Sequence, residues 1–135
     1  MNISLDSDVV ISSLLSHTGA SFHLFTLKNN FSFAISSIQI QEIDRSCVEL
    51  GVPKDKFQQN TMPFLKVIPV EKKIKKYERF VNDIFDSHVV AGATFHKSSF
   101  LLTYNLKDYK KEIIKKELGI TILTPGLFLQ FLRSQ

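Results

Sequence analysis

Residues 3–14 read ISLDSDVVISSL, and they combine a short apolar run, an acid and the start of a helical pattern. The run from Ile3 to Leu5 has the length and composition of a buried strand, and Asp6 follows directly after it. The next residues place small or apolar side chains on one helical face: Val9, Val10, Ser13 and Leu14. A strand that leads straight into a helix is the repeating unit of a parallel sheet, and this order decides the fold class.

The same alternation continues along the rest of the chain. Further strands are expected at Phe31–Ile35, around Leu65–Val70, at Phe100–Thr103 and at Gly119–Leu123. The expected helices cover residues 22–27, the stretch from Ser36 or Ser37 to Gly51, the lysine-rich stretch to about Asn82, the residues after Asp86 or Ser87, Tyr109–Leu118, and the chain after Thr124 and Pro125. The strands are apolar along their whole length, which is typical of parallel strands buried on both faces. We therefore expect an α/β fold, a three-layer α/β/α sandwich with a central, mostly parallel sheet, formed by a single domain at 1–135.

Two of these helices carry additional packing signals. In the helix that ends at Gly51, one stripe is expected to face the core: Ile40, Ile43, Cys47 and Leu50. In the helix that begins near Asp86, Gly92 would permit a close approach to a neighbouring element.

The composition is that of a folded and mildly basic domain. Hydrophobic residues make up 44% and charged residues 22%, which excludes a disordered chain. Cys47 is the only cysteine, two acids interrupt what would be the core of a secretory signal, and no stretch is long enough to span a membrane. A reducing cytoplasm is therefore the expected location. The net charge of +4 favours a polyanionic partner, although the run EKKIKKYER at 71–79 is first of all the solvated face of an amphipathic helix.

Acidic and amide side chains follow several of these strands or border the helices beside them. Asp6 follows the first strand, Glu42 borders a buried helical stripe, Asp86 precedes a helix, and Asn105 and Asp108 follow the fourth strand. Each acid alone is explained as a helix cap or a border residue. Sites in open parallel sheets, however, form at the carboxyl ends of the strands, and carboxylates gathered there repel one another unless a cation lies between them. Oxygen ligands without His or Cys select Mg²⁺ or Mn²⁺, ions that promote phosphodiester hydrolysis.

Five segments in this order resemble the PIN-domain family. LDSDVVISSLL at 5–15 is similar to its opening strand and helix, and ISSIQIQEI at 35–43 resembles the helix that carries a metal-binding Glu. DSHVVAGA at 86–93 looks like the helix opened by a metal-binding Asp, FLLTYNLKDY at 100–109 resembles the strand and loop with the fourth acidic position, and ITILTPGLFLQFL at 120–132 is similar to the closing strand and helix. The resemblance spans essentially the whole chain.

The resemblance implies a metal-dependent endoribonuclease that cuts RNA. Such proteins are most often the toxin of a VapC-type toxin–antitoxin pair, inhibited by a small antitoxin protein and commonly homodimeric. The residues that match the family's metal-binding acids are Asp6, Glu42 and Asp86.

The chain departs from the family pattern at the fourth acidic position and in the opening motif. Asn105 stands where the family usually has Asp, and a TxNLKD variant of the motif would transfer the acidic role to Asp108. Asp8 replaces the usual Asn, and it would either add a charge to the site or cap the first helix. Asp83 is close in sequence to Asp86, but Asp86 leads directly into the helix of small residues.

Two other functions remain open on sequence grounds. A degenerate PIN domain would bind RNA or a protein without cutting, which the neutral Asn105 would permit. Asp6-Ser7-Asp8 also resembles the nucleophile motif of haloacid-dehalogenase-type phosphatases, which additionally need a Lys and a second acidic pair. His88 is expected to be structural, because two residues along a helix it points away from Asp86.

Overall fold

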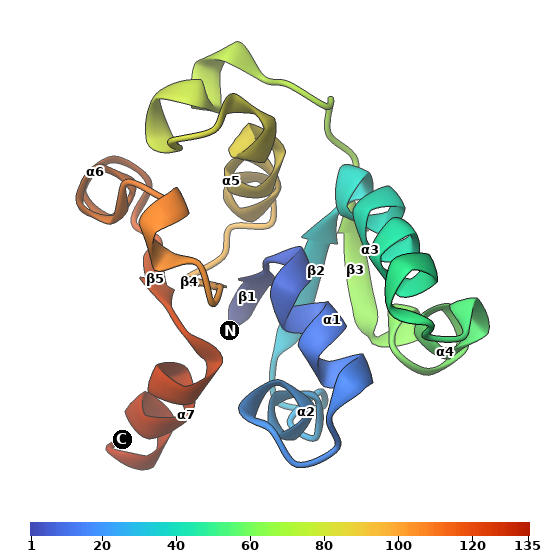
Figure 1. Ribbon diagram of the computed structural model, residues 1–135. Helices are drawn as coiled ribbons and strands as arrows, with labels where there is room; N and C mark the ends of the chain where they lie inside the picture. The colour runs from blue at the N-terminus through green and yellow to red at the C-terminus, as the bar shows by residue number, and fades with distance from the viewer.

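The computed structural model describes residues 1–135 and is organised around one five-stranded sheet in which every neighbouring pair of strands is parallel (Figure 1). The strands are β1 (Asn2–Leu5), β2 (Ser32–Ser36), β3 (Leu65–Ile68), β4 (Phe100–Leu102) and β5 (Thr121–Leu123), in the order β3-β2-β1-β4-β5. The helices are α1 (Ser7–Leu15), α2 (Ala20–Phe25), α3 (Ser37–Leu50), α4 (Lys54–Asn60), α5 (Ser87–Phe95), α6 (Lys111–Leu118) and α7 (Pro125–Arg133). Short 3₁₀ segments complete the chain: η1 (Met62–Phe64), η2 (Lys75–Phe80), η3 (Ile84–Asp86) and η4 (Leu106–Asp108).

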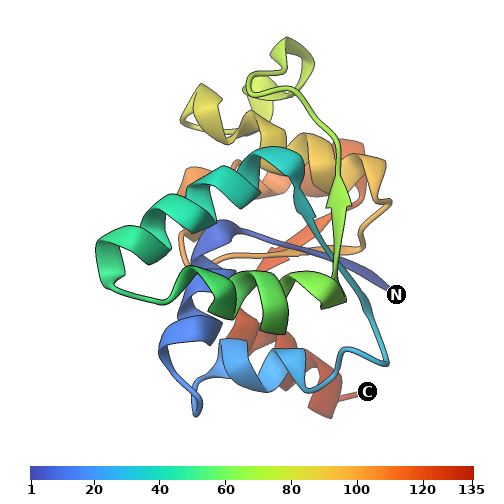
Figure 2. The same ribbon diagram turned by 90° about the vertical axis from the view of Figure 1, so that its right-hand side faces the viewer.

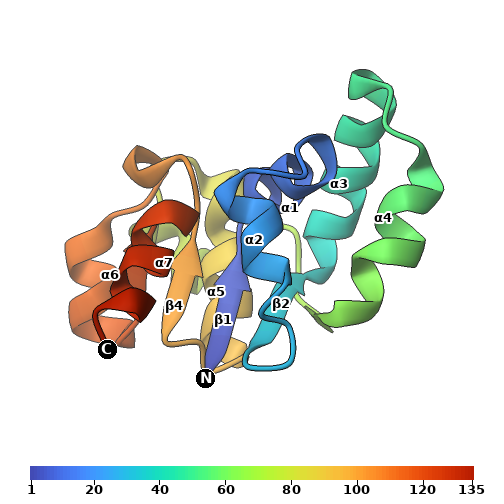
Figure 3. The same cartoon turned by 90° about the horizontal axis from the view of Figure 1, so that it is seen from below.

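Two separate apolar cores cover the two faces of the sheet. On one face, Ile3, Leu5 and Phe33 pack with residues of α1, α2, α3, α4 and α7. On the other face, Leu101 and Ile122 pack with α5, α6 and η2. Alternate residues of a strand point to opposite faces, and β4 accordingly gives Phe100 and Leu102 to the first core and Leu101 to the second. Figures 2 and 3 show the resulting three layers, and the predicted α/β/α sandwich is confirmed.

Local signals in the sequence set the ends of α3 as predicted. The Ser36 side chain accepts a hydrogen bond from the backbone N–H of Gln39, and the Gln39 side chain accepts one from the backbone N–H of Ser36, which is a complete capping box. Gly51 ends the helix at a φ of 71°, a conformation that costs glycine little. One position of the expected stripe is wrong: Leu50, the last residue of α3, is 53% exposed, whereas Cys47 one turn earlier is buried.

The lysine-rich segment before residue 82 is not the predicted amphipathic α-helix. It forms only η2, in which Tyr77 and Phe80 are buried three residues apart, a spacing that matches the three residues per turn of a 3₁₀-helix. The chain then becomes extended, and Val81 pairs with Tyr109 in an antiparallel bridge. This pairing also explains why α6 begins at Lys111 and not at Tyr109 as predicted.

The chain reverses direction across the sheet beside β1. From β1 it proceeds to β2 and β3 on one side and then returns to β4 and β5 on the other. The carboxyl ends of β1 and β4 therefore flank a topological switch point, where open α/β sheets form their binding crevice. In Figure 3, β1 lies between β4 and β2. None of the helices combines the length and apolar character that crossing a membrane requires.

Candidate metal centre

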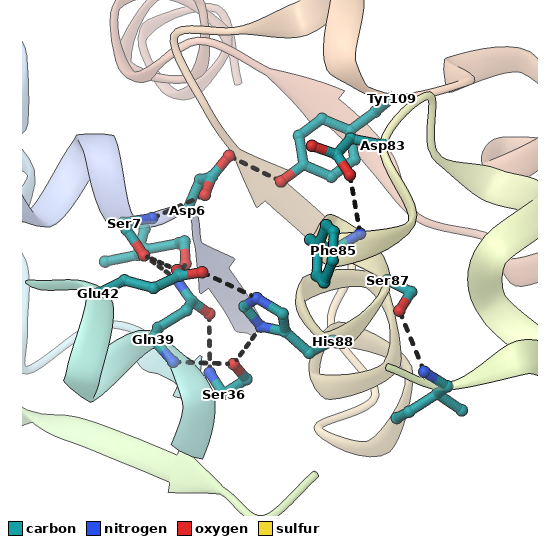
Figure 4. Close-up of polar contacts among 12 residues, drawn as sticks. Asp6, Ser7, Ser36, Gln39, Glu42, Asp83, Phe85, Ser87, His88 and Tyr109 are labelled. Atoms are coloured by element: carbon teal, nitrogen blue, oxygen red, sulfur yellow. Dashed lines mark hydrogen bonds and ion pairs between the residues drawn. The ribbon is translucent and has the colours of Figure 1, made fainter. Parts of the chain in front are cut away.

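Asp6 lies at the carboxyl end of β1 and is held by three hydrogen bonds. Its Oδ1 accepts the backbone N–H of Ser7 at 2.8 Å, so Asp6 is indeed the N-cap of α1. Its Oδ2 accepts the hydroxyl of Thr103 at 3.0 Å and that of Tyr109 at 2.7 Å. Thr103 follows β4 and Tyr109 follows η4, so the β4 side of the switch point orients this carboxylate. Figure 4 shows the contact between Asp6 and Tyr109.

Asp8 lies two residues further along and is joined to the fourth position of the site. Its Oδ2 accepts the backbone N–H of Tyr104 at 3.1 Å and the side-chain N–H of Asn105 at 3.0 Å. Its Oδ1 is buried and has no hydrogen-bond partner. Asp6, and not Asp8, therefore caps α1. The side-chain amide of Asn105 is neutral, so its hydrogen bond leaves the charge of an ionised Asp8 uncompensated.

Glu42 projects from α3 toward the same crevice, with its side chain 38% exposed. Ser7 donates its hydroxyl to Oε1 at 2.9 Å, and His88 lies 3.1 Å from Oε2. Ser7 directly follows Asp6, so this one residue supports both acids: its backbone N–H donates to Asp6 and its hydroxyl donates to Glu42.

Asp86 ends η3 and stands before α5 without capping it, because its side chain makes no hydrogen bond to the helix. The neighbouring acid behaves differently: the Asp83 side chain accepts the backbone N–H of Phe85 at 3.0 Å (Figure 4). Asp108 lies in η4, and its backbone carbonyl accepts the N–H of Asn82 at 3.0 Å, which joins η4 to the segment before η3. Asp86 is thus free to serve a ligand, whereas Asp83 is engaged locally.

Burial and mutual repulsion raise the pKa of three of these acids. Burial raises the pKa of Asp6, with a further contribution from the charge of Glu42. Burial and the charge of Asp6 raise the pKa of Asp8 to about 7. Burial and the nearby acids, Asp6 first, raise the pKa of Asp86 to about 6. Protons are therefore held more tightly than in isolated carboxyl groups, as expected where negative charge is concentrated.

Glu42 and Tyr109 titrate differently from these acids. Burial would raise the pKa of Glu42, but the hydrogen bond and charge of His88, together with the Ser7 hydroxyl, lower it. Burial and the Asp6 charge raise the pKa of Tyr109 well above its ordinary value, so its hydroxyl stays a hydrogen-bond donor.

The donor set suits a hard divalent cation, but the side chains do not enclose one as they lie. All the candidate ligands are oxygen atoms, negative charge is in excess, and the buried Oδ1 of Asp8 lacks a partner. No three acids, histidines or cysteines come close enough together to hold a metal ion. Oδ2 of Asp6 is turned toward two protein donors, so enclosing an ion requires this carboxylate to rotate.

Sequence reasoning did not identify the residues that support the acids. Thr103 and Tyr109 hold Asp6, and Ser7 and His88 hold Glu42. His88 makes no hydrogen bond to Asp86, as its helical spacing predicted. It contacts Glu42 instead, and this contact depends on how α5 packs relative to α3, which the sequence does not display. The only local signal was the hydroxyl residue directly after Asp6.

The comparisons with known proteins concern the fold. No protein-family model matches the sequence, and no curated protein matches it. Among solved structures, the chain is similar to VapBC2 from Rickettsia felis bound to a DNA fragment from the promoter, with a TM-score of 0.57 and 19% identity over 90% of this chain and 97% of that one. It is similar to FitAcB from Neisseria gonorrhoeae, with a TM-score of 0.62 and 15% identity over 92% and 98% of the two chains.

A third similar structure is FitAB bound to an IR36 DNA fragment, with a TM-score of 0.61 and 15% identity over 91% of this chain and 94% of that one. At these identities the likeness shows a shared fold. It confirms the α/β architecture expected from the PIN-domain resemblance, over nearly the full length of this chain.

Proposed function

We propose that the protein is a metal-dependent endoribonuclease of the PIN type. The observation that carries this proposal is the concentration of acids at the switch point, where the charge of Asp6 raises the pKa of Asp86 and the charge of Glu42 raises the pKa of both. Uncompensated repulsion between carboxylates destabilises the folded protein. A bound cation would remove this repulsion, which explains why the acids are gathered here.

Asp6, Glu42 and Asp86 would hold Mg²⁺ or Mn²⁺, with Asp108 or the carbonyl oxygen of Asn105 as the fourth ligand. When bound, the ion would activate water and neutralise charge on the phosphate. Thr103 and Tyr109 orient Asp6 for this task through hydrogen bonds of 3.0 and 2.7 Å.

Exposed lysines on two adjoining segments support a nucleic-acid substrate. The lysines of segments 72–76 and 107–116 are all exposed, and none forms an ion pair. The two segments lie side by side, because Arg79 bonds Glu117 through two contacts of 2.7 and 2.8 Å and Lys110 donates its backbone N–H to Phe80 at 2.9 Å. Unpaired lysines bind phosphates with release of counterions, so this surface suits the RNA backbone.

A small antitoxin partner and a homodimer belong to the same proposal. Their support is the VapC-type resemblance of the sequence, together with the fold shared with the VapBC2 and FitAB complexes. The buried free thiol of Cys47 is consistent with a reducing cytoplasm.

A binding module without cleavage is the second candidate. It is favoured by the hydrogen bond between Asn105 and Asp8 and by the absence of three acids close enough to hold a metal. The phosphatase alternative finds no support, because no lysine forms an ion pair with Asp6 and its carboxylate is occupied by three donors.

Cleavage of single-stranded RNA with Mn²⁺ tests the proposal. Wild type should cut, chelation should stop it, and Asp6→Asn and Asp86→Asn should each abolish cutting while far-UV circular dichroism stays unchanged. Asp55→Asn, an exposed acid in α4, is the matched control and should cut like wild type. Cutting by all variants alike contradicts the proposal.

The same assay separates the two candidate functions. RNA that is bound but never cut, at any Mn²⁺ concentration, supports the binding module. If the protein cuts, comparing Asp108→Ala with Asn105→Ala at matched Mn²⁺ identifies the fourth ligand.

A further inference from the structure

A buried polar chain connects the end of β2, α5 and α3. His88 is fully buried in α5, and its two ring nitrogens face different partners (Figure 4). Nδ1 lies 2.7 Å from the Ser36 hydroxyl, and Nε2 lies 3.1 Å from Oε2 of Glu42. A buried histidine with both nitrogens engaged is fixed in orientation.

The hydrogen bonds assign the ring proton to one nitrogen. The Ser36 hydroxyl accepts the backbone N–H of Gln39 at 3.3 Å as the cap of α3. It has a single proton of its own to donate, and His88 Nδ1 is the acceptor within reach. Because an ionised carboxylate only accepts hydrogen bonds, Nε2 of His88 carries a ring proton and donates it to Oε2 of Glu42.

The other oxygen of Glu42 is held in the same manner. Ser7 donates to Oε1 at 2.9 Å, while Ser7 itself accepts a side-chain N–H of Gln39 at 3.2 Å. Gln39 also donates to the backbone carbonyl of Leu5 at 2.8 Å, at the end of β1. Each carboxylate oxygen of Glu42 thus receives one donor from the protein and keeps a further lone pair for a ligand.

Gly92 allows α5 to come close enough for this contact. Gly92 lies one turn after His88 on the same side of α5. A Cβ added there would meet the Cβ of Ser36 at 3.3 Å, tighter than ordinary van der Waals contact. A larger residue at this position would require Ser36 or α5 to shift by a few tenths of an ångström, and Ser36 is the residue that His88 contacts.

We propose that His88 and Ser36 are positioning residues, which hold the Glu42 carboxylate of the proposed metal centre through the Nε2-protonated tautomer of His88. The role in metal binding rests on the proposed function of Glu42. The tautomer and the network rest only on the hydrogen bonds of the folded protein.

Ring nitrogen NMR of the ¹⁵N-histidine-labelled full chain tests the tautomer directly. The His88 signals, assigned as those lost in His88→Gln, should show a protonated Nε2 and a bare Nδ1. A protonated Nδ1 with a bare Nε2 overturns the proposal, whether or not the protein binds metal.

Calorimetric titration with Mn²⁺ tests the positioning role. His88→Leu should weaken Mn²⁺ binding about 10- to 100-fold, as expected when a residue that orients a metal ligand is lost. His88→Gln, which retains an N–H donor for Glu42, should recover most of this loss. The matched control is His96→Leu: His96 is also buried, directly follows α5, and bonds Ser32, not an acid. This control should bind Mn²⁺ like wild type.

Folded His88→Leu that binds Mn²⁺ as tightly as wild type overturns the proposal. If His88→Leu does not fold, Gly92→Ala replaces it, because this change removes no polar group and only shifts Ser36 or α5. It should weaken Mn²⁺ binding and shift the His88 ring signals, and unchanged affinity would be evidence against the positioning role. Failure of wild type itself to bind Mn²⁺ overturns the proposed function, which distinguishes the two failures.

Discussion

Replacing Asp86 by Asn should stabilise the protein when no divalent metal is present. Burial and the charges of Asp6, Asp83, Asp108 and Glu42 raise the pKa of Asp86 from 3.8 to about 6. A shift of about two units corresponds to roughly 3 kcal/mol for a fully buried group. The side chain is only half-buried, so solvent screening reduces the expected effect to about 1–1.5 kcal/mol.

The sign follows from proton binding. A carboxyl group whose pKa is higher in the folded protein binds protons more tightly there than in the unfolded chain. Its contribution to stability is therefore full below about pH 4 and is lost as the pH rises through about 6. Asp86→Asn cannot ionise and escapes this loss. The variant should match wild type near pH 4 and exceed it at about pH 7 and above.

Urea unfolding followed by far-UV circular dichroism, with EDTA present, measures this difference. The control Asp55→Asn, in exposed α4, should change the free energy of unfolding by less than about 0.5 kcal/mol at every pH. Adding Mn²⁺ should stabilise wild type by about 2.7 kcal/mol at a hundred times its Kd, and should stabilise Asp86→Asn much less. Two results would refute the reasoning. Either Asp86→Asn is less stable than wild type at neutral pH, or the difference in free energy of unfolding between the two proteins is the same at every pH.

Three further changes test the surroundings of the site. Tyr109→Phe removes a donor from the buried Asp6 carboxylate and should lower the free energy of unfolding by about 1–2 kcal/mol in urea titrations; unchanged stability would show that this bond is not formed. Phe128→Ala empties a fully buried position between Phe31 and Phe100 and should cost about 3–5 kcal/mol by the same measurement, so a loss below about 1 kcal/mol would contradict this packing. Replacing the exposed lysines 110 and 111 together by Ala should reduce the salt dependence of RNA binding, measured as the slope of log K against log salt, by about 1–1.5, and an unchanged slope would exclude both from the RNA surface.

The alternation of strands and helices was predictable because local signals specify it. Asp6 and Ser36 begin helices, Gly51 and Gly119 end them in the left-handed conformation, and apolar runs mark the strands. These signals act within a few residues, so the sequence displays them directly.

Features that depend on distant packing were not predictable in the same way. Segment 75–80 has the composition of an amphipathic helix, but it forms a 3₁₀ turn, and the next residue, Val81, is extended and pairs with Tyr109. The same pairing brings the Tyr109 hydroxyl to Asp6. Strand order is likewise a property of the assembled sheet.

The position of the candidate acids near one edge of the sheet was predictable, whereas the residues that support them were not. The order of the acids along a parallel sheet places them at one edge, whichever way each side chain turns. The direction of the Glu42 carboxylate depends on His88 and Ser7, which come from two other helices. Asn105 shows the same limit, since its bond to Asp8 joins residues 97 positions apart.

A crystal structure of the protein soaked in Mn²⁺, with anomalous diffraction measured, tests the central claim most directly. The account predicts an anomalous peak at the switch point, within coordination distance of carboxylate oxygens of Asp6, Glu42 and Asp86. The Asp6 side chain should be rotated from its present hydrogen bonds enough to share the ion, whereas Glu42 should keep its contacts with Ser7 and His88. No peak at millimolar Mn²⁺, or a peak bound only by residues elsewhere on the surface, would contradict the account.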